Sequence, residues 1–288
     1  GWHAYGLLGA SCIFVAVAIT SLGTHAHIPH LKAPPPRRRI TLGQIFSEIW
    51  ETASNPSFRA LFIATLFGFI ASGTSASLNQ YINGFFWEFT GDQIGALTGA
   101  VFFSPLVALI LAPFVSRTLG KKRAAITVGI LAFTIAPAPV FARLMGWMPA
   151  NGTPELFNII LFITVIDIAL IIAYQIIAAS MVADIVEQSE LQTGRRSEGV
   201  FFAGISFIRK LSQFSGLFLA AIILSTAAIV PGSTASEVTA DSVRALGWGY
   251  ATVLLSIWLL MLVAISFYRI SREDHAQNLA TLAQKSAE

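Results

Sequence analysis

The sequence carries little charge. Only 11% of its 288 residues are Asp, Glu, Lys or Arg, whereas a soluble domain carries about 25%. Hydrophobic residues make up 55% of the chain, and its mean hydropathy is +0.71. This composition predicts an integral membrane protein with the lipid bilayer as its surroundings. The net charge of +3 is too small to indicate binding to nucleic acid, and we predict none.

The sequence also lacks the groups that most enzymes and cofactor-binding proteins need. Cys12 is the single cysteine, so an intrachain disulfide and a Cys-pair metal site are both excluded. The chain has no glycine-rich phosphate loop ending in Lys-Ser or Lys-Thr, and no G-x-S-x-G elbow for a nucleophilic serine. His25, His27 and His30 lie close together in THAHIPH, but no acid or cysteine accompanies them. We therefore predict no enzyme, no metal site and no cofactor.

Long apolar runs dominate what is present. Seven of them approach or exceed the ~20 residues that a helix needs to cross a ~30 Å hydrocarbon core. They cover residues 4–22, 58–85, 94–115, 124–146, 156–182, 200–230 and 246–268. We expect all seven to be helices, because backbone exposed to lipid must satisfy its own hydrogen bonds. The fold class is therefore an all-α polytopic membrane protein with about seven transmembrane helices.

Lysine and arginine gather on alternate connections between these runs. The basic groups are Lys32 with Arg37 to Arg39, Arg117 with Lys121 to Arg123, Arg195 with Arg196, and Arg269 with Arg272. The positive-inside rule places this side, and the C-terminus, in the cytoplasm. We expect a multi-pass protein of the plasma (inner) membrane. Trp87, Trp147 and Trp248 are expected at the outer interface.

The longest connection, 24–56, separates one helix from the next six. Pro34, Pro35 and Pro36 exclude a continuous helix there. Apolar residues recur at helical spacing between Leu42 and Trp50 and predict a helix lying on the membrane surface. The expected regions are a last helix of an N-terminal half (1–23), a cytoplasmic central loop (24–56), a six-helix bundle (57–270) and a cytoplasmic tail (271–288). Prolines at 105, 113, 137 and 139 predict kinks in the third and fourth of the seven runs.

Three motifs carry a resemblance to a known family. They are ADIVEQSELQTGRRSEG at 183–199 with Lys210 after it, NPSFRALF at 55–62, and RTLGKKRA at 117–124. The first two resemble the glycoside-pentoside-hexuronide:cation symporters, the melibiose-permease-like branch of the major facilitator superfamily. The third is similar to the basic loop that this superfamily repeats in each six-helix half. Together the resemblances cover residues 4–270.

The resemblance implies both an activity and an incomplete architecture. It identifies the chain as helix six and the C-terminal half of a twelve-helix transporter, whose N-terminal half would be its missing partner. The implied function is symport of a sugar or glycoside, driven by Na⁺ or H⁺ and operating by alternating access. The site of the coupling ion would lie in the missing half. Other interpretations stay open: a different solute such as a lipid or sugar acid, a seven-helix receptor, or a membrane protein that does not transport.

Lys210 is the first candidate for the substrate pathway. It lies about ten residues into an apolar run, roughly 15 Å deep, where an unpaired charge costs about 3 kcal/mol or more. Ser206 and Gln213 are one turn away at i−4 and i+3, so the three predict a polar stripe suited to sugar hydroxyl groups. The resemblance also assigns Lys210 and Ser206 to the cavity. We expect Arg209 to point elsewhere.

Five further residues are predicted to line the pathway. Asp167 is a carboxyl group in the middle of an apolar run, and it either takes part in transport or is a buried acid, neutral or paired with Lys210. Gln175 falls where the family has a cavity aromatic, and the adjacent Tyr174 would replace that ring only if the helix rotates. Ser72, Ser75 and Asn79 lie at i, i+3 and i+7, and Tyr81 follows shortly after. Such a polar face either lines a pathway or holds helices together.

The charged segment after 182 has a separate predicted role. Asp184, Glu187 and Arg196 match charged positions of the family's cytoplasmic gate, with Glu190 and Glu198 as additional candidates. Exposed ion pairs contribute only about 0–1 kcal/mol each, which suits a gate that must open and close. The alternative is a solvated loop that only follows the positive-inside rule.

Overall fold

The computed structural model describes residues 2–26, 28–30, 41, 43, 47, 50–51, 53–193, 198–230, 232–234 and 237–287. The chain divides into two units, Gly1–Gln44 and Ile45–Glu288. Every regular element in the described ranges is a helix, which confirms the all-α fold class. The predicted surface helix between Leu42 and Trp50 lies largely outside the described residues, although Trp50 itself is helical.

The first unit contains one long helix. α1 (Trp2–His25) is followed by the 3₁₀ turn η1 (Ile28–His30). Apolar residues occupy every face of α1, as in a helix surrounded by lipid rather than by water. Its segment Gly6–His25 is long and apolar enough to cross a membrane.

The second unit contains the remaining helices. They are α3 (Pro56–Tyr81), the π-helical turn η2 (Ile82–Phe86), α4 (Gly91–Ala100), the 3₁₀ turn η3 (Val101–Phe103), α5 (Ser104–Leu119), α6 (Lys121–Ile135), α7 (Ala138–Leu144), α8 (Pro154–Thr193), α9 (Glu198–Thr226), α10 (Ala240–Ser266) and α11 (Arg272–Ala287). Six segments here are long and apolar enough to span a membrane, so with α1 the total in the described chain is seven. This confirms the predicted number of transmembrane segments.

Prolines interrupt two of the spans, as the sequence predicts. The third span is interrupted by η3. Pro105 follows in the first turn of α5, where a backbone N–H group would make no hydrogen bond within the helix, so proline is tolerated there. The fourth span breaks between α6 and α7, with Pro137 as the cap of α7. Pro113 lies inside α5 without ending it. Each of these spans is thus a pair of shorter helices in series.

α8 is longer than the sequence analysis predicts. The expected membrane run ends at 182, but the helix continues to Thr193. Asp184, Glu187 and Glu190 therefore lie on a helix and not on a loop, which corrects the prediction. The reason is local, because residues 155–193 contain neither glycine nor proline and the next glycine is Gly194.

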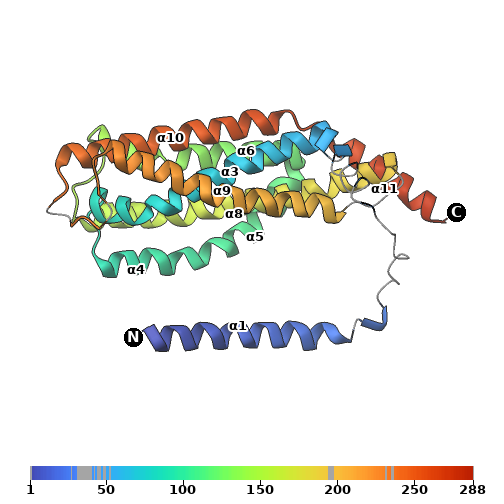
Figure 1. Ribbon diagram of the computed structural model, residues 1–288, viewed down its shortest axis with the longest axis horizontal. Coiled ribbons are helices and arrows are strands. Elements are labelled where there is room, and N and C mark those ends of the chain that lie inside the picture. The colour runs from blue at the N-terminus through green and yellow to red at the C-terminus, as the bar shows by residue number, and fades with distance from the viewer. Residues whose placement is uncertain are drawn as a thin grey trace. The chain divides into compact units, whose positions relative to one another are not determined.

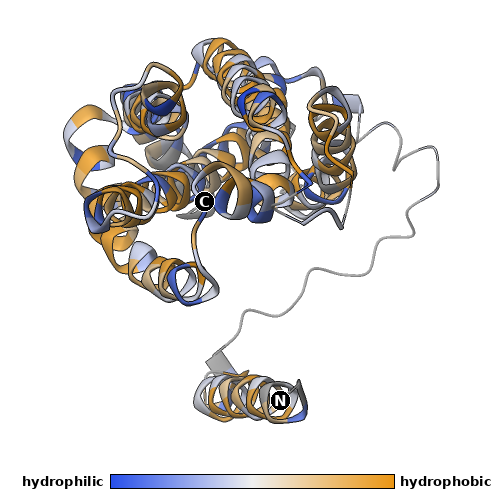
Figure 2. Cartoon of the chain, turned by 90° about the vertical axis from the view of Figure 1, so that its left-hand side faces the viewer, coloured by the Kyte–Doolittle hydropathy of each residue, from blue (hydrophilic) through white to orange (hydrophobic). Residues whose placement is uncertain are grey.

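The helices of the second unit form a bundle in which α3 packs against α9 and α10, while α8 packs against α5 and α6 (Figure 1). α11 lies at one end of this bundle, beside the end of α8; we call it the α11 end. η2, the end of α7 and the start of α10 lie at the opposite end, the η2 end. Hydrophobic residues occur on all sides of these helices (Figure 2), and side chains such as Phe114, Phe162 and Phe214 are exposed. This distribution is typical of a bundle in lipid.

α3 and α9 make the closest helix contact. A Cβ atom added at Gly216 of α9 would lie 2.6 Å from the carbonyl carbon of Gly73 and 2.7 Å from the amide nitrogen of Thr74. The two backbones therefore touch directly, as small residues allow in membrane helices. This contact fixes how far apart α3 and α9 lie, and hence the width of any cavity between them.

The NPSFRALF motif starts α3 and anchors it. The side chain of Asn55 accepts hydrogen bonds from the amides of Ser57 and Phe58, and Pro56 occupies the first helical turn. The Asn55 amide also donates to Gln188 Oε1 of α8 at 3.3 Å. Phe58 meets Phe201 of α9 edge to face at 5.0 Å. The motif thus holds α3, α8 and α9 together at the α11 end.

Trp87 differs from its expected position at the outer interface. Only 3% of its surface is exposed, because its ring packs edge to face against Phe86 and stacks with Phe89. Trp147 is exposed. Trp87 is therefore part of the core at the η2 end and not of an aromatic belt.

Candidate functional site

A cavity of about 200 Å³ lies between α3, α8 and α9, with Trp258 of α10 also contributing to its wall. Its polar lining comes from Thr65, Ser72, Tyr174, Gln175, Ser206 and Arg209, and its apolar lining includes Phe69, Ile171 and Phe202. Mostly apolar walls with a few polar groups are typical of small-molecule sites. Three of the predicted pathway residues, Tyr174, Gln175 and Ser206, meet here.

Tyr174 has the least satisfied polar group of the cavity wall. The residue is 5% exposed, and its hydroxyl group has no hydrogen-bond partner among the described residues. A buried polar group left without a partner costs about 1–3 kcal/mol. Gln175, next to it on α8, lines the same cavity. The sequence analysis expected Tyr174 there only after a rotation of the helix, but the structure brings both residues to the cavity together.

α9 contributes a stripe of residues that includes Arg209. Phe202, Ile205, Ser206 and Arg209 follow one another at i, i+3, i+4 and i+7 and all line the cavity. The guanidinium carbon of Arg209 lies 5.3 Å from the centre of the Phe69 ring, a cation–π contact. The expectation that Arg209 points elsewhere is therefore wrong, since it shares the cavity-facing stripe with Ser206.

Lys210 is one position further round α9. It is exposed and does not belong to the lining of this cavity. Gln213 lies on α9 as well, but its side chain is outside the described residues. The polar stripe predicted through Ser206 and Lys210 is thus divided, with Ser206 on the cavity and Lys210 on the open face of α9.

Asp167 lies deeper in the bundle, on α8. Its Oδ1 atom is buried without a hydrogen-bond partner in the described part of the chain, and no ion pair joins it to Lys210 there. The Tyr250 hydroxyl group of α10 lies 3.0 Å from Ser75 Oγ of α3 and within electrostatic range of Asp167. Polar groups from α3, α8 and α10 therefore gather near Asp167. The sequence analysis did not select Tyr250, although a tyrosine in an otherwise apolar run was the available signal.

Asn79 and Tyr81 lie near the end of α3, away from the cavity. Asn79 Oδ1 accepts a hydrogen bond from Asn83 Nδ2 at 3.0 Å. Tyr81 lines a separate depression of about 740 Å³ between α3 and α9, together with Leu217 and Ser225. The structure therefore does not bring these two residues together with Tyr174 and Gln175.

The residues predicted as a cytoplasmic gate lead to a cluster at the α11 end. Lys121 Nζ of α6 donates to Asp184 Oδ1. His275 Nδ1 of α11 lies 3.3 Å from Asp184 Oδ1 and 3.1 Å from Glu187 Oε2. We call Lys121, Asp184, Glu187 and His275 the charged cluster. Asp184 is only 3% exposed, whereas the sequence analysis expected exposed pairs.

The structure gives less information on the other residues of the predicted gate. Glu190 is half-buried on α8. Arg196, and the side chain of Glu198, are outside the described residues. Lys121 and His275 were not selected from the sequence. The RTLGKKRA motif contains Lys121 and could have indicated it. His275 could not be found in this way, because its position beside α8 depends on the packing of α11.

A reciprocal cap holds His275 in place. Ser271 Oγ accepts from the amide of Asp274 at 3.1 Å, and Asp274 Oδ2 accepts from the amide of Ser271 at 2.9 Å. This backbone hydrogen bond holds the pKa of Asp274 below its usual value. The cap fixes the first turn of α11 and therefore the direction of the next side chain, His275.

The charged cluster also resembles a metal site in its composition. The ligand atoms of Asp184, Glu187 and His275 all lie within 4.8 Å of one another. The Lys121 ammonium group, however, already contacts Asp184 Oδ1 and would repel a cation. Burial and the nearby carboxylates of Asp184 and Glu187 raise the pKa of Tyr268 well above its usual value. The arrangement is best described as an ion pair between Lys121 of α6 and Asp184 of α8, with His275 of α11 lying beside the two carboxylates.

Comparison with known proteins places the chain among transporters. A model of the MFS/sugar transport protein family matches residues 1–272. An uncharacterized symporter of Bacillus subtilis (strain 168) is 24% identical over 254 residues, which are 87% of this chain and 51% of that protein. A putative sulfoquinovose importer of Escherichia coli (strain K12) is 22% identical over 281 residues, or 94% of this chain and 54% of the importer. An uncharacterized symporter of Synechocystis is 26% identical over 225 residues, or 77% and 40%.

The chain spans about half the length of these relatives. The matches are to transport proteins, which confirms the prediction that the chain is not an enzyme. They also agree with the family resemblance of the three sequence motifs. Because the family model extends over almost the whole chain, this chain belongs to the MFS/sugar transport protein family.

Proposed function

We propose that this protein is a secondary active transporter that binds a sugar-like solute in the cavity between α3, α8 and α9. The observation that carries the proposal is the buried Tyr174 hydroxyl group, which has no partner among the described residues and belongs to a residue of the cavity wall. A solute hydroxyl group would satisfy it. The Gln175 amide and the Ser206 hydroxyl group add donors and acceptors on the same wall.

The transport cycle is proposed to be cation-coupled alternating access. Relatives twice as long as this chain support a protein of two halves, with solute bound between them near the bilayer midplane. In this proposal the spans from α3 to α10 form one half. A second set of six helices would supply the facing wall and the site for Na⁺ or H⁺. The importer from Escherichia coli supports a sugar-like solute.

Several other residues are assigned to this pathway as part of the proposal. Lys210 would face the second half, because it is exposed on α9. Asp167, Gln213, Asn79 and Tyr81 would contact solute or water at other stages of the cycle. Asp167 is suited to exchange a proton, since a carboxyl group within a membrane helix is seldom retained without a function.

The α11 end is proposed to face the cytoplasm. Lys121, Lys122, Arg123 and Arg269 gather there, and an excess of Lys and Arg marks cytoplasmic loops. Asp184 and Glu187, with Glu190, Arg196 and Glu198, would then form part of an inner gate. Breaking and remaking of such ion pairs would accompany opening on that side.

Removing single polar groups from the cavity wall tests the proposed site. In ion-gradient-driven uptake of radiolabelled glycosides, pentosides and hexuronides by the full-length protein in proteoliposomes, we expect Tyr174→Phe and Gln175→Ala to raise KM about 10-fold. Each change removes one hydrogen bond worth about 1–1.5 kcal/mol and keeps the helix intact. Gln277→Ala, at an exposed position on α11, is the matched control and should transport like the wild type.

Two results would count against this function. If KM is unchanged in both Tyr174→Phe and Gln175→Ala, the cavity is not the solute-binding site. If the wild-type protein took up no member of the panel under either a Na⁺ or an H⁺ gradient, the proposal of sugar transport itself would be overturned.

A further inference from the structure

Three side chains of metal-ligating type meet at the α11 end of the bundle. Asp184 and Glu187 lie one turn apart on α8, and His275 lies in α11. Their ligand atoms are all within 4.8 Å of one another, and the described part of the chain contains no second group of three His, Cys, Asp or Glu residues with this spacing. A histidine together with two carboxylates is a donor set that binds divalent transition metals.

The distances within this set are close to those around a zinc ion. His275 Nδ1 lies 3.1 Å from Glu187 Oε2 and 3.3 Å from Asp184 Oδ1. Zn²⁺ binds nitrogen and oxygen at about 2.0–2.1 Å with tetrahedral geometry, which puts neighbouring ligand atoms about 3.3–3.4 Å apart. The Asp184 and Glu187 ligand atoms lie within 4.8 Å of each other, and a small rotation of the half-buried Glu187 side chain would bring them to the same spacing.

Two of the ligand atoms face each other without a hydrogen bond. Glu187 Oε2 and His275 Nδ1 are both buried, and neither has a hydrogen-bond partner among the described residues. They lie 3.1 Å apart, so their contact lacks the orientation that a hydrogen bond needs. An ionised carboxylate is an acceptor only, and so is a ring nitrogen that carries no proton. Two acceptors at this distance repel each other unless a positive charge lies between them, and a metal ion supplies one.

The helices that carry these ligands are held together by other contacts. The two acids share one face of the continuous helix α8 at i and i+3. The Tyr268 hydroxyl group donates to the carbonyl oxygen of Met181 at 3.4 Å and ties the segment before α11 to the same stretch of α8. The reciprocal cap at the first turn of α11 then orients His275. The ligands are thus positioned by the fold itself, as a preorganised site requires.

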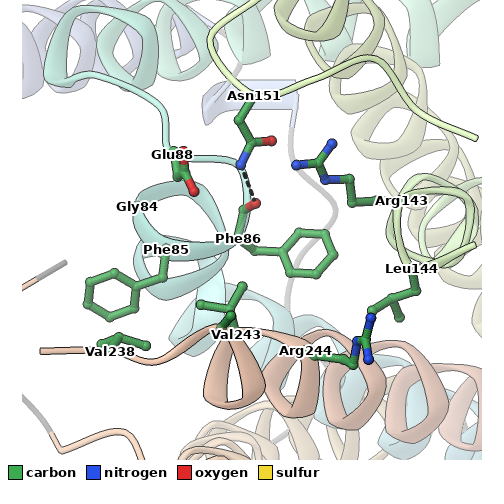
Figure 3. Close-up of a pocket in the computed structure, with 11 residues that line it drawn as sticks. Gly84, Phe85, Phe86, Glu88, Arg143, Leu144, Asn151, Val238, Val243 and Arg244 are labelled. Atoms are coloured by element: carbon green, nitrogen blue, oxygen red, sulfur yellow. Dashed lines mark hydrogen bonds between the residues drawn. The ribbon is translucent and has the colours of Figure 1, made fainter. Parts of the chain in front are cut away.

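The pocket of about 680 Å³ at the η2 end offers no comparable set of ligands. Glu88 is the one carboxylate among its described lining residues, and neither histidine nor cysteine belongs to that lining. Figure 3 shows Arg143 reaching into this pocket from the side opposite Glu88, with the Asn151 amide bonded to the Phe86 carbonyl group. The metal-ligating set is therefore a feature of the α11 end.

Lys121 is the competitor for the metal at this set. Its ammonium group contacts Asp184 Oδ1 and repels a cation for as long as that contact lasts. The Lys121 side chain is 27% exposed and belongs to the first residue of α6, so it can turn away toward solvent. A pocket of about 600 Å³ that Asp184 and His275 line gives an ion access to the ligands. No other Lys or Arg of the described residues forms an ion pair with the three ligands.

We propose that Asp184, Glu187 and His275 bind one Zn²⁺ ion, or a similar divalent transition-metal ion, in exchange for Lys121. The metal takes over the Asp184 oxygen, water fills the fourth position, and the Lys121 ammonium group moves to solvent. A metal link between α8 and α11 thereby replaces the ion pair between α6 and α8. The sequence analysis predicted no metal site, because His275 reaches the two acids only through the packing of α11. The inference does not depend on which solute the protein transports.

Zinc titration of the full-length protein in detergent tests the site. Alanine replaces the three histidines of THAHIPH in every sample, so that they cannot bind the metal. We expect isothermal titration calorimetry to show a saturable Zn²⁺ site that His275→Gln and Glu187→Gln each weaken about 10-fold or more, since loss of even an indirect partner of a metal ligand costs about 10–100-fold. Lys121→Met should tighten binding about 10-fold or more, because a competing positive charge is removed.

Glu273→Gln is the matched control. Glu273 is an exposed acid of α11 that lines the same pocket as His275 but is not one of the three ligands. Its replacement should change the affinity for Zn²⁺ by no more than about 3-fold, as expected when one exposed charge is removed. An excess of Mg²⁺ should not displace the Zn²⁺, because Mg²⁺ binds oxygen ligands and gains little from an imidazole.

Four results would overturn the proposal. They are the absence of saturable Zn²⁺ binding, an affinity that His275→Gln leaves unchanged, an affinity that Lys121→Met does not raise, and displacement by Mg²⁺, which would indicate a cluster of acids only. If Lys121→Met proves too unstable to purify, the His275 and Glu187 variants decide the question. None of these measurements involves transport, so the zinc site and the proposed transport can fail independently.

Discussion

Gly216→Ala is expected to lower the melting temperature of the protein by more than about 5 °C. The added methyl group would lie 2.6 Å from the carbonyl carbon of Gly73 and 2.8 Å from its Cα. Backbone atoms cannot rotate away as a side chain can, so α3 and α9 must separate. Overpacking of this kind costs about 1–3 kcal/mol or more. Thermal unfolding of the full-length protein in detergent, followed by circular dichroism, measures the effect.

Gly95→Ala provides the comparison within the same chain. Gly95 is also a helical glycine, in α4, but no atom lies within 4 Å of an added Cβ. Alanine is the better helix former by about 1 kcal/mol, so this variant should be as stable as the wild type or slightly more stable. Equal melting temperatures for the two variants would show that α3 and α9 do not touch at Gly216. Transport should also fall in Gly216→Ala, because the same two helices form walls of the cavity.

Lys121→Met is expected to destabilise the protein by about 3–5 kcal/mol. The substitution removes the ammonium group that contacts Asp184 and leaves that carboxylate, of which only 3% is exposed, without its main partner. His275 Nδ1 at 3.3 Å is then the remaining group able to compensate the charge. Thermal unfolding of the full-length protein measures the loss.

The double variant Lys121→Met/Asp184→Asn separates charge from packing. Asparagine keeps the shape of Asp184 without its charge, so we expect the double variant to recover most of the lost stability. Lys122→Met, the neighbouring lysine at the α11 end, should change the melting temperature by no more than about 1 °C, as expected for surface substitutions. If the double variant is as unstable as Lys121→Met alone, a buried charge is not the cause of the destabilisation.

The number and position of the membrane spans follow closely from the sequence, because the requirement for about 20 apolar residues is a property of the bilayer itself. The end of α8, in contrast, could not be predicted from hydropathy. Hydropathy falls after 182, but helix formation depends on propensity, and no residue from Ala183 to Thr193 opposes it. The helix therefore extends beyond the end of the apolar run.

The candidate site could be predicted only in part. Spacing along one helix identified Ser206, because a face of a helix can be deduced from its own sequence, and Gln175 was selected through the family resemblance. Arg209 was misplaced, since Lys210 and Arg209 differ by one position and the neighbouring helices decide which of them faces the cavity. The pairing of Asp184 with Lys121 and His275 joins three helices. Such contacts depend on tertiary packing that one sequence does not reveal.

The continuity of α8 has a mechanical consequence. Forty residues at 1.5 Å each make a rod of about 60 Å, twice the thickness of the hydrocarbon core. Gln175 and Asp184 are about 13 Å apart along this rod, so a tilt of 10° about Gln175 displaces Asp184 sideways by about 2 Å. That displacement is enough to break its contact with Lys121. A rigid tilt of the helix would therefore couple the cavity wall, which includes Gln175, to the Lys121–Asp184 contact near its far end.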